Sequence, residues 1–288
     1  MKILVTGANG QLGKELQAIL EKESPGVALY TDVDTLDITD AQSIETFVNE
    51  NNVTHIINCA AYTAVDKAES DQTQCYRINV DAVQNIATVA SKHEIRVIHI
   101  STDYVFDGKK HRPYTEADKT NPTSTYGTTK RKGEKILLSF CPDAIIIRTA
   151  WLYSPHGHNF VKTMLKLGSE KPELRVVFDQ IGSPTSATDL AKAIYTILKS
   201  RQWISGTYHF TNEGVASWYD FAKAIHRIGG ITSCKIYPVT TDDYPTPATR
   251  PHYSVLDKSI IKRTFGIDIP YWEDSLVKCI AQIKEEEE

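Results

Sequence analysis

The sequence predicts an α/β fold built on a doubly wound parallel sheet, with a smaller α/β region toward the C-terminus. Two features of the first half lead to this prediction: short apolar runs alternate with longer helical patterns, and a glycine-rich turn directly follows the first run. Such alternation is typical of successive βαβ units. Most of the runs are continuous Val and Ile stretches, which indicates strands covered on both faces.

The elements of the first half follow in strict order. Strands are expected at Lys2–Thr6, Val27–Thr31, His55–Asn58, Val97–Ile100 and Ala144–Arg148. Helices are expected at Gln11–Lys22, Asp40–Asn49 (capped by Thr39 or Asp40), Ser70–Ser91 and Ser124–Leu138. After Trp151 the alternation loosens, and the segment Tyr237–Pro251 holds four prolines. We therefore expect a dinucleotide-binding domain over residues 1–150. Residues 151–288 are expected to form mainly a substrate region that returns some elements to the first domain.

Composition and charge exclude several classes of protein. The 288 residues are 41% hydrophobic and 24% charged, values typical of a folded globular chain. The net charge of −4 leaves no basic excess for nucleic acid. No apolar run approaches the roughly 20 residues that cross a bilayer. The five cysteines are scattered without a CxxC pair, which disfavours disulfides and a zinc site. A cytoplasmic protein without a membrane or nucleic-acid partner is expected.

The glycine-rich turn carries the first functional signal. Gly7, Gly10 and Gly13 form a GxxGxxG pattern between the first strand and the first helix. Such glycines permit a tight turn, bring backbone N–H groups to a pyrophosphate and let helix and strand pack closely. The turn therefore predicts a Rossmann-type dinucleotide site; the alternative is a glycine-rich turn without a ligand.

Which dinucleotide binds is a separate question. Asp32 ends the second strand, 19 residues after Gly13, where a carboxylate accepts a ribose 2′-OH and repels a 2′-phosphate. No arginine is near Asp32 in the sequence, so this residue favours NADH; a merely solvated Asp32 is the alternative. Asp37 and Ile38 are expected beside the adenine. The segment 58–63, with Ala60, Ala61, Tyr62 and Thr63, leaves the third strand where the cofactor crosses the sheet edge.

A tyrosine and a lysine supply the predicted catalytic chemistry. Tyr126 and Lys130 are four residues apart, on one face of the fourth predicted helix. A neighbouring cation favours phenolate and lowers the pKa of a tyrosine, which suits a proton shuttle. Thr102 follows the fourth strand and can bond the same substrate oxygen. A second YxxxK copy, Tyr219 to Lys223, has no such neighbour and is interpreted as structural.

Several longer motifs make the chain resemble a known family. They include TGANGQLG at 6–13, NCAAYTAVDKAE at 58–69, STDYVFDG at 101–108, YGTTK at 126–130, RTAWLY at 148–153, DQIGSPT at 179–185 and PTPATRP at 245–251. With these motifs the chain resembles the dTDP-4-dehydrorhamnose reductase family of the extended short-chain dehydrogenase/reductases. Related 4,6-dehydratases place Glu after the Thr-Asp pair, whereas this chain has Tyr104. Dehydration is therefore disfavoured.

The resemblance implies a reaction and a set of roles. Hydride transfer to the C4 ketone of dTDP-4-dehydro-6-deoxy-L-mannose would give dTDP-L-rhamnose. Tyr126 would donate the proton, Lys130 would hold the nicotinamide ribose and Thr102 would orient the carbonyl. The resemblance also assigns contacts: cofactor at Gly10, Gln11, Leu12, Asp37, Ile38, Ala61, Tyr62 and Thr63, and sugar at Asp103 and Trp151. Arg250 would bind the pyrophosphate of the dTDP-sugar. Trp151 as a core aromatic residue and Arg250 as a surface ion pair are the alternatives.

The family also bears on cofactor, metal and assembly. It commonly prefers NADPH and often accepts NADH, so we predict NADPH with NADH possible. Some members dimerise through Mg²⁺-sharing carboxylates, and Glu15 and Asp189 stand where two of those ligands would be. No third ligand is evident in the sequence, so Mg²⁺ is not predicted, and a monomer or a homodimer is expected. Two other functions stay open: a non-catalytic dinucleotide-binding regulatory subunit, and a reductase of another nucleotide-4-ketosugar.

Overall fold

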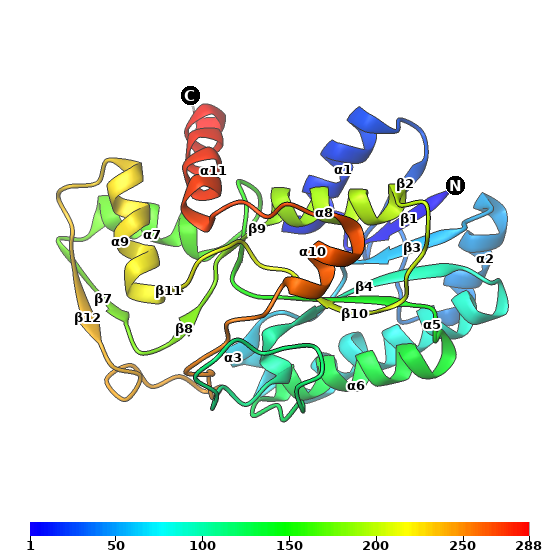
Figure 1. The fold of residues 1–288 in the computed structure, drawn as a ribbon, viewed down its shortest axis with the longest axis horizontal. Coiled ribbons are helices and arrows are strands. Elements are labelled where there is room, and N and C mark those ends of the chain that lie inside the picture. The colour runs from blue at the N-terminus through cyan, green and yellow to red at the C-terminus, as the bar shows by residue number, and fades with distance from the viewer. Residues whose placement is uncertain (288) are drawn as a thin grey trace.

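A six-stranded parallel sheet forms the centre of the molecule in the computed structural model, which describes residues 1–287 (Figure 1). The strand order is β10–β5–β4–β3–β1–β2. The strands are β1 (Ile3–Thr6), β2 (Ala28–Thr31), β3 (His55–Asn58), β4 (Arg96–Thr102), β5 (Ile145–Thr149) and β10 (Gly206–His209). Because β2 and β3 lie on opposite sides of β1, the topological switch point falls beside β1. The predicted fold class is confirmed.

Helices cover both faces of the sheet, as the continuous apolar strands require (Figure 1). On one face lie α1 (Gln11–Glu23) and α8 (Ala187–Lys199), packed on Ile3 and Val5 of β1. On the other face, α2 (Ala41–Asn51), α5 (Ala82–Lys92) and α6 (Thr125–Phe140) pack with Leu4 of the same strand. Successive residues of one strand thus enter two different hydrophobic clusters.

The third predicted helix differs from the expectation of one continuous element. It is divided into α4 (Gln72–Tyr76), a π-helical turn (Arg77–Asp81) and α5, and a short α3 (Val65–Ala68) precedes it. Within the π turn, the Asn79 side chain accepts from the Tyr62 N–H at 2.9 Å and donates to the Tyr62 carbonyl at 3.1 Å. The extra residue of the wider turn accompanies this bond to the loop after β3, and such π turns are frequent at functional sites.

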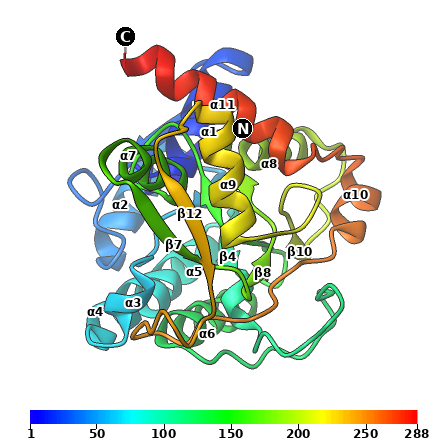
Figure 2. The ribbon, with the colours of Figure 1, turned by 90° about the vertical axis from the view of Figure 1, so that its left-hand side faces the viewer.

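The C-terminal half forms a second layer beside the sheet, seen face-on in Figure 2. It contains β6 (Leu152–Tyr153), α7 (Phe160–Glu170), β7 (Glu173–Val177), β8 (Ile181–Gly182), β9 (Thr185–Ser186), β11 (Ala216–Ser217), α9 (Trp218–Gly229), β12 (Lys235–Val239) and α11 (Trp272–Glu287). In this half of the chain, α10 (Ser259–Phe265) instead packs on β10 of the central sheet. Its own core includes Met164, Phe221, Ile225 and Leu276. In contrast, β10 pairs with β5 and α8 packs on α1. The domain boundary at residue 150 stays a prediction.

Two further findings concern the chain as a whole. Within residues 1–287, no helix combines the length and apolar character needed to cross a bilayer. The cysteines are free thiols, and four of them (Cys75, Cys141, Cys234 and Cys279) are buried.

Candidate active site

A cavity of about 930 Å³ opens at the carboxyl ends of the parallel strands. Loops after β1, β2, β3, β4 and β5 all contribute to its wall, and Trp218 and Arg250 close it from the C-terminal half. Ligands of open α/β sheets bind at this edge, beside the switch point. The predicted residues that line it are Gly7, Gly10, Gln11, Leu12, Gly13, Asp32, Asp37, Ile38, Ala60, Ala61, Thr63, Thr102, Asp103, Tyr126, Lys130, Trp151 and Arg250.

The glycine-rich turn has the geometry of a backbone cradle. Gly7 has φ of +65°, and a Cβ atom there would lie 2.7 Å from the Ala60 nitrogen. At Gly13 a Cβ atom would lie 2.5 Å from the Ala8 Cα atom, so the first turn of α1 packs directly on the loop after β1. The helix N-terminus and its free N–H groups therefore face the cavity, which fits a pyrophosphate.

Asp32 stands at the end of the cavity formed by the β2 loop. Its Oδ2 atom accepts from the Asn9 N–H at 3.0 Å and its Oδ1 atom from the Val33 N–H at 2.8 Å. These bonds tie the β2 loop to the glycine turn. Arg77 also lines this end, with its Nη2 atom 2.8 Å from Thr39 Oγ1 and 3.9 Å from Asp37 Oδ2. Arg77 is far from Asp32 in the sequence, so the sequence alone did not predict an arginine at this end of the cavity. The π turn that begins at Arg77 brings it there.

Tyr62 does not line the cavity, contrary to its prediction as a cofactor residue. Its backbone is held by Asn79, and its hydroxyl donates to Asp71 Oδ2 at 3.1 Å. The side chain therefore points to α4 rather than into the site. Its neighbours Ala61 and Thr63 do face the cavity.

Tyr126 and Thr102 come together because α6 begins close to the end of β4. The Ser124 hydroxyl caps α6 by accepting from the Gly127 N–H at 3.1 Å. A Cβ atom at residue 127 would lie 2.2 Å from the Tyr104 carbonyl oxygen, so only glycine permits this approach. Thr102 then lies beside Tyr126 at the wall of the cavity, with its hydroxyl donating to Asp103 Oδ1 at 3.0 Å. The expected pair is thus adjacent in space.

Lys130 lies one helical turn after Tyr126 and is buried. Its ammonium donates to the Ile100 carbonyl at 2.7 Å and lies 3.5 Å from His99 Nε2. Burial lowers the pKa of Lys130 to about 8, against the opposing influence of the Glu134 charge. An ammonium has three N–H donors, so one remains for a ligand in the cavity.

The pKa of Tyr126 is the point where the structure differs most from the sequence-based expectation. A neighbouring ammonium was expected to lower this pKa. Instead, burial raises the pKa of Tyr126 above its ordinary value, and the charge of Asp103 adds to the increase. The prediction of an acidified phenol is wrong for this structure, because desolvation disfavours the phenolate more than the nearby donors favour it.

Asp103 and Trp151 shape the part of the cavity next to Tyr126. Asp103 is buried, and its Oδ2 atom has no hydrogen-bond partner among the described residues. Burial raises the pKa of Asp103 to about 6. Trp151 has a left-handed backbone with φ of 49°, and its ring stacks on Trp218 at a centroid distance of 3.6 Å. The left-handed backbone of Trp151 and the stacking on Trp218 fix the orientation of the Trp151 ring, which lines the cavity.

Arg250 closes the cavity from the proline-rich segment. Its Nη2 atom donates to Asp66 Oδ2 at 2.6 Å, and Tyr104 lines the same part of the cavity. The segment is held further by the Ala248 N–H, which donates to Asp66 Oδ1 at 3.3 Å. Arg250 is therefore both an ion-pair partner and a cavity residue. Sequence reasoning missed Asp66 and Trp218, for which no local pattern exists.

Glu15 and Asp189 lie on the packed helices α1 and α8, and both are buried. Asp189 Oδ2 accepts from Asn212 Nδ2 at 2.8 Å, and Glu15 Oε1 lies 3.7 Å from His156 Nε2. Over residues 1–287, no group of three or more His, Cys, Asp or Glu side chains is arranged to hold a metal ion. Both carboxylates have partners within the chain.

Comparison with known proteins gives a consistent result. The sequence profile of the RmlD substrate binding domain matches residues 1–285. A dTDP-4-dehydrorhamnose reductase of Aggregatibacter actinomycetemcomitans is 40% identical over 284 residues, covering 96% of this chain and 97% of the relative.

Two solved structures are similar over nearly their full length. A dTDP-4-dehydrorhamnose reductase from Clostridium acetobutylicum superposes with a TM-score of 0.94 and 45% identity, covering 99% of this chain and 100% of the other. The dTDP-4-dehydrorhamnose reductase from Bacillus anthracis, in complex with NADP, superposes with a TM-score of 0.93 and 38% identity, covering 98% of this chain and 100% of the other.

We expect Gly13→Ala to weaken both the fold and dinucleotide binding. The added methyl group would overlap backbone atoms of Ala8 and Gly7 and push α1 away from the loop. The free energy of unfolding should fall by about 1–3 kcal/mol. Denaturant unfolding and NADPH fluorescence titration measure the two effects. Lys14→Ala, at the exposed neighbouring position, is the control. Unchanged stability and affinity in Gly13→Ala would contradict the close-packing argument.

Proposed function

Because this chain belongs to the RmlD substrate binding domain family, we propose that it is a dTDP-4-dehydrorhamnose reductase. It reduces the C4 ketone of dTDP-4-dehydro-6-deoxy-L-mannose to the alcohol of dTDP-L-rhamnose, with a nicotinamide dinucleotide as the reductant. The observation that carries this proposal is the meeting of Thr102, Tyr126 and Lys130 at the wall of one large cavity. The intact set supports an enzyme over a regulatory subunit.

The first half of the cavity suits the cofactor. The glycine cradle at Gly7, Gly10 and Gly13 would hold the pyrophosphate, and Asp32, Asp37 and Ile38 would surround the adenosine. The reduced nicotinamide supplies a hydride when bound. Arg77 places a positive charge at the adenosine end of the cavity, which favours the 2′-phosphate of NADPH, whereas Asp32 places a negative charge there, which favours the 2′-hydroxyl of NADH. NADPH is the proposed cofactor and NADH the alternative.

Tyr126 provides the proton in this reduction. When the carbonyl carbon gains the hydride, the electron pair of the C=O π bond moves to oxygen, and the Tyr126 hydroxyl gives its proton to that oxygen. Burial raises the pKa of Tyr126, so the phenol carries its proton at neutral pH and can give it up only to the strongly basic alkoxide that forms on the substrate. Thr102 bonds the same oxygen, and the charge forming there makes both bonds stronger in the transition state. The phenolate then regains a proton from water in the cavity.

The second half of the cavity suits a dTDP-sugar. Asp103 lines this half of the cavity and would accept a hydrogen bond from a sugar hydroxyl, and the Trp151 ring would pack on the sugar. Arg250 binds the diphosphate in place of, or together with, its present partner Asp66. The Arg250 guanidinium, which pairs with the Asp66 carboxylate in this structure, has the geometry to pair with a phosphate group.

Two alternatives are tested with the same assay. Purified protein is incubated with NADPH or NADH and candidate nucleotide-4-ketosugars, absorbance is followed at 340 nm, and the product is identified by NMR. An unchanged absorbance with every ketosugar would indicate a regulatory subunit. Turnover of a different ketosugar would keep the chemistry and change the substrate. A cytoplasmic location, and a monomer or homodimer without Mg²⁺, complete the proposal.

We expect Tyr126→Phe to remove the proton donor while preserving the shape of the site. The kcat should fall by about 10²–10⁴-fold, with the Kd of NADPH nearly unchanged. Tyr219→Phe is a matched control, because this tyrosine belongs to the second YxxxK copy on α9 and lies outside the cavity. Near-normal turnover in Tyr126→Phe would exclude the acid role.

The pH dependence should show an acid limb caused by Asp103. Since the pKa of this carboxyl is raised to about 6, Asp103 becomes protonated and loses an acceptor as the pH falls through that value. We expect kcat/KM to fall below about pH 6 in the natural protein. In Asp103→Asn, kcat/KM should be lower throughout and lack this limb. Identical acid limbs in the two proteins would contradict the role of Asp103.

Asp32→Ala should shift cofactor preference toward NADPH. Removing the carboxylate removes repulsion of the 2′-phosphate and one acceptor for the 2′-OH of NADH. The ratio of the two Kd values should change by about tenfold, equal to about 1.4 kcal/mol. Asp34→Ala, an exposed loop position outside the cavity, is the control. An unchanged ratio would show that Asp32 only anchors Asn9.

A further inference from the structure

A buried carboxylate lies one helical turn beyond Lys130 and takes no part in the proposed reaction. Residues 126, 130 and 134 are spaced by four, so Tyr126, Lys130 and Glu134 follow one another along one face of α6. Glu134 is completely buried. Burial alone would raise the pKa of this carboxyl, yet hydrogen bonds and the charge of Arg148 bring it below its ordinary value. Glu134 is therefore an anion inside the protein.

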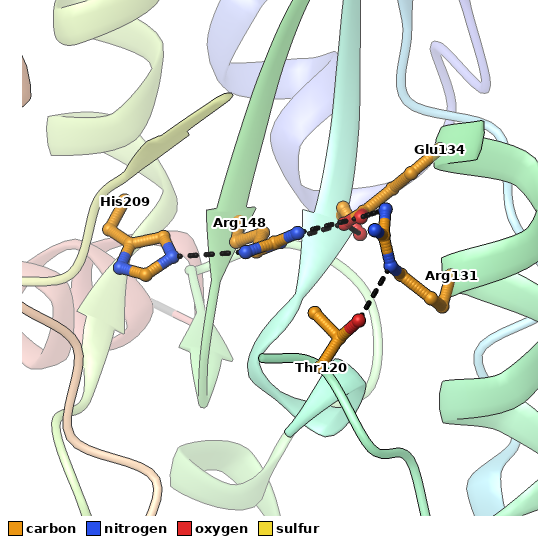
Figure 3. A network of polar contacts seen from close by, with 6 residues as sticks. Thr120, Arg131, Glu134, Arg148 and His209 are labelled. Atoms are coloured by element: carbon orange, nitrogen blue, oxygen red, sulfur yellow. Dashed lines mark hydrogen bonds and ion pairs between the residues drawn. The ribbon is translucent and has the colours of Figure 1, made fainter. Parts of the chain in front are cut away.

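Four hydrogen bonds reach the two oxygens of Glu134 (Figure 3). Arg148 of β5 donates through Nε to Oε1 and through Nη2 to Oε2, each at 2.8 Å. Ser101 of β4 donates to Oε1 at 2.6 Å. Arg131 of α6 donates to Oε2 at 2.9 Å and, through Nε, to Thr120 Oγ1 at 2.8 Å. One side chain thus joins α6 to two strands of the sheet.

Among residues 1–287, Glu134 is the carboxylate that forms an ion pair with Arg148. His209 lies on the other side of the guanidinium, with Nε2 3.5 Å from Arg148 Nη1 (Figure 3). Burial lowers the pKa of His209 to about 3, so the ring is neutral at physiological pH. The Phe106 ring covers the guanidinium at 5.2 Å. Glu134 is consequently the counter-ion of Arg148, in a fork geometry that fixes both groups.

The strand residues bound by Glu134 stand next to residues of the site. Ser101 immediately precedes Thr102, and Arg148 comes three residues before Trp151. On the helix, Glu134 is one turn from Lys130 and two turns from Tyr126. The carboxylate therefore lies behind the site and touches every element that carries a proposed catalytic residue.

We infer that Glu134 is a positioning residue: through Ser101 and Arg148 it holds the helix of Tyr126 and Lys130 against the strand end of Thr102. One helical turn from Lys130, its charge also favours the protonated ammonium. The inference rests on the proposed reductase function. The reaction requires the donor, the carbonyl and the hydride to be aligned, and a misplacement of about 1 Å can lower the rate about 100-fold. A buried, fully hydrogen-bonded carboxylate provides that rigidity.

The charge of Glu134 matters because few other groups oppose the desolvation of Lys130. The Lys130 ammonium contacts the Ile100 carbonyl and His99 on β4. The titratable groups around it are Cys59 after β3, Cys75 on α4, and Tyr126 and Glu134 on α6. The pKa of His99 lies well below its ordinary value, and burial raises the pKa of both thiols, so these groups are neutral near pH 7. Tyr126 is a neutral phenol. Glu134 is the one anion in this set.

The first test is Glu134→Gln, which keeps the size of the side chain and removes its charge. We expect kcat to fall by about 10–100-fold, with the KM of the ketosugar and the Kd of NADPH changed much less. The basic limb of kcat/KM should move to lower pH, because Lys130 loses its proton more easily. Loss of a merely structural contact would lower thermal stability without moving this limb. Natural kcat and an unmoved limb would overturn the inference.

A second measurement is independent of turnover. Lysine labelled with ¹³C at Cε is titrated by NMR, and the Lys130 signal is assigned by its loss in Lys130→Arg. Its midpoint should be lower in Glu134→Gln than in the natural protein, and equal midpoints would overturn the charge coupling. If the natural protein reduces no ketosugar, the proposed function fails, and this titration still tests the inference separately.

Ser101→Ala covers the case in which Glu134→Gln does not fold. It removes the link between Glu134 and β4 but keeps the ion pairs with Arg148 and Arg131. We expect a lower kcat with the Lys130 midpoint unchanged; a natural kcat would overturn the positioning role. Glu45→Gln, which breaks an ion pair with Lys92 between α2 and α5, is the control for loss of a paired carboxylate.

Discussion

The close contact between the start of α6 and the end of β4 is the constraint on which this site depends. Gly127 permits it, since any Cβ atom would overlap the Tyr104 carbonyl oxygen. Glu134 maintains it further along the helix, through hydrogen bonds to Ser101 and Arg148. Close approach at one end and a buried ion pair at the other leave the helix little freedom. Thr102 and Tyr126 are thereby kept together at the wall of the cavity.

The cavity is lined mainly by the first half of the chain and completed by segments from the second half. The parallel sheet provides the cradle, because the loops after its strands all emerge at one edge. The C-terminal half provides the stacked pair Trp151 and Trp218, together with Arg250. Arg250 pairs with Asp66 of α3, so the proline-rich segment is attached to the first half of the chain even without a ligand.

Burial governs the chemistry that these groups can perform. It raises the pKa of Tyr126 and Asp103 and lowers that of Lys130. The Tyr126 phenol therefore stays protonated near neutral pH in the protein without ligands. In the same environment, Asp103 and Lys130 change charge near neutral pH. The pH response of the enzyme is therefore expected to come from the neighbours of Tyr126 and not from Tyr126 itself.

The sequence by itself determined what depends on local pattern: the strands of the first half, the glycine turn, and the spacing of Tyr126 and Lys130 on one helix face. Only the tertiary structure brought Arg77 and Asp66 to the site, turned Tyr62 away from it, and returned β10 to the sheet. These features arise from contacts between residues far apart in the chain. The direction of the Tyr126 pKa shift belongs with them, because desolvation depends on everything packed around a group, whereas sequence spacing reveals a single neighbour.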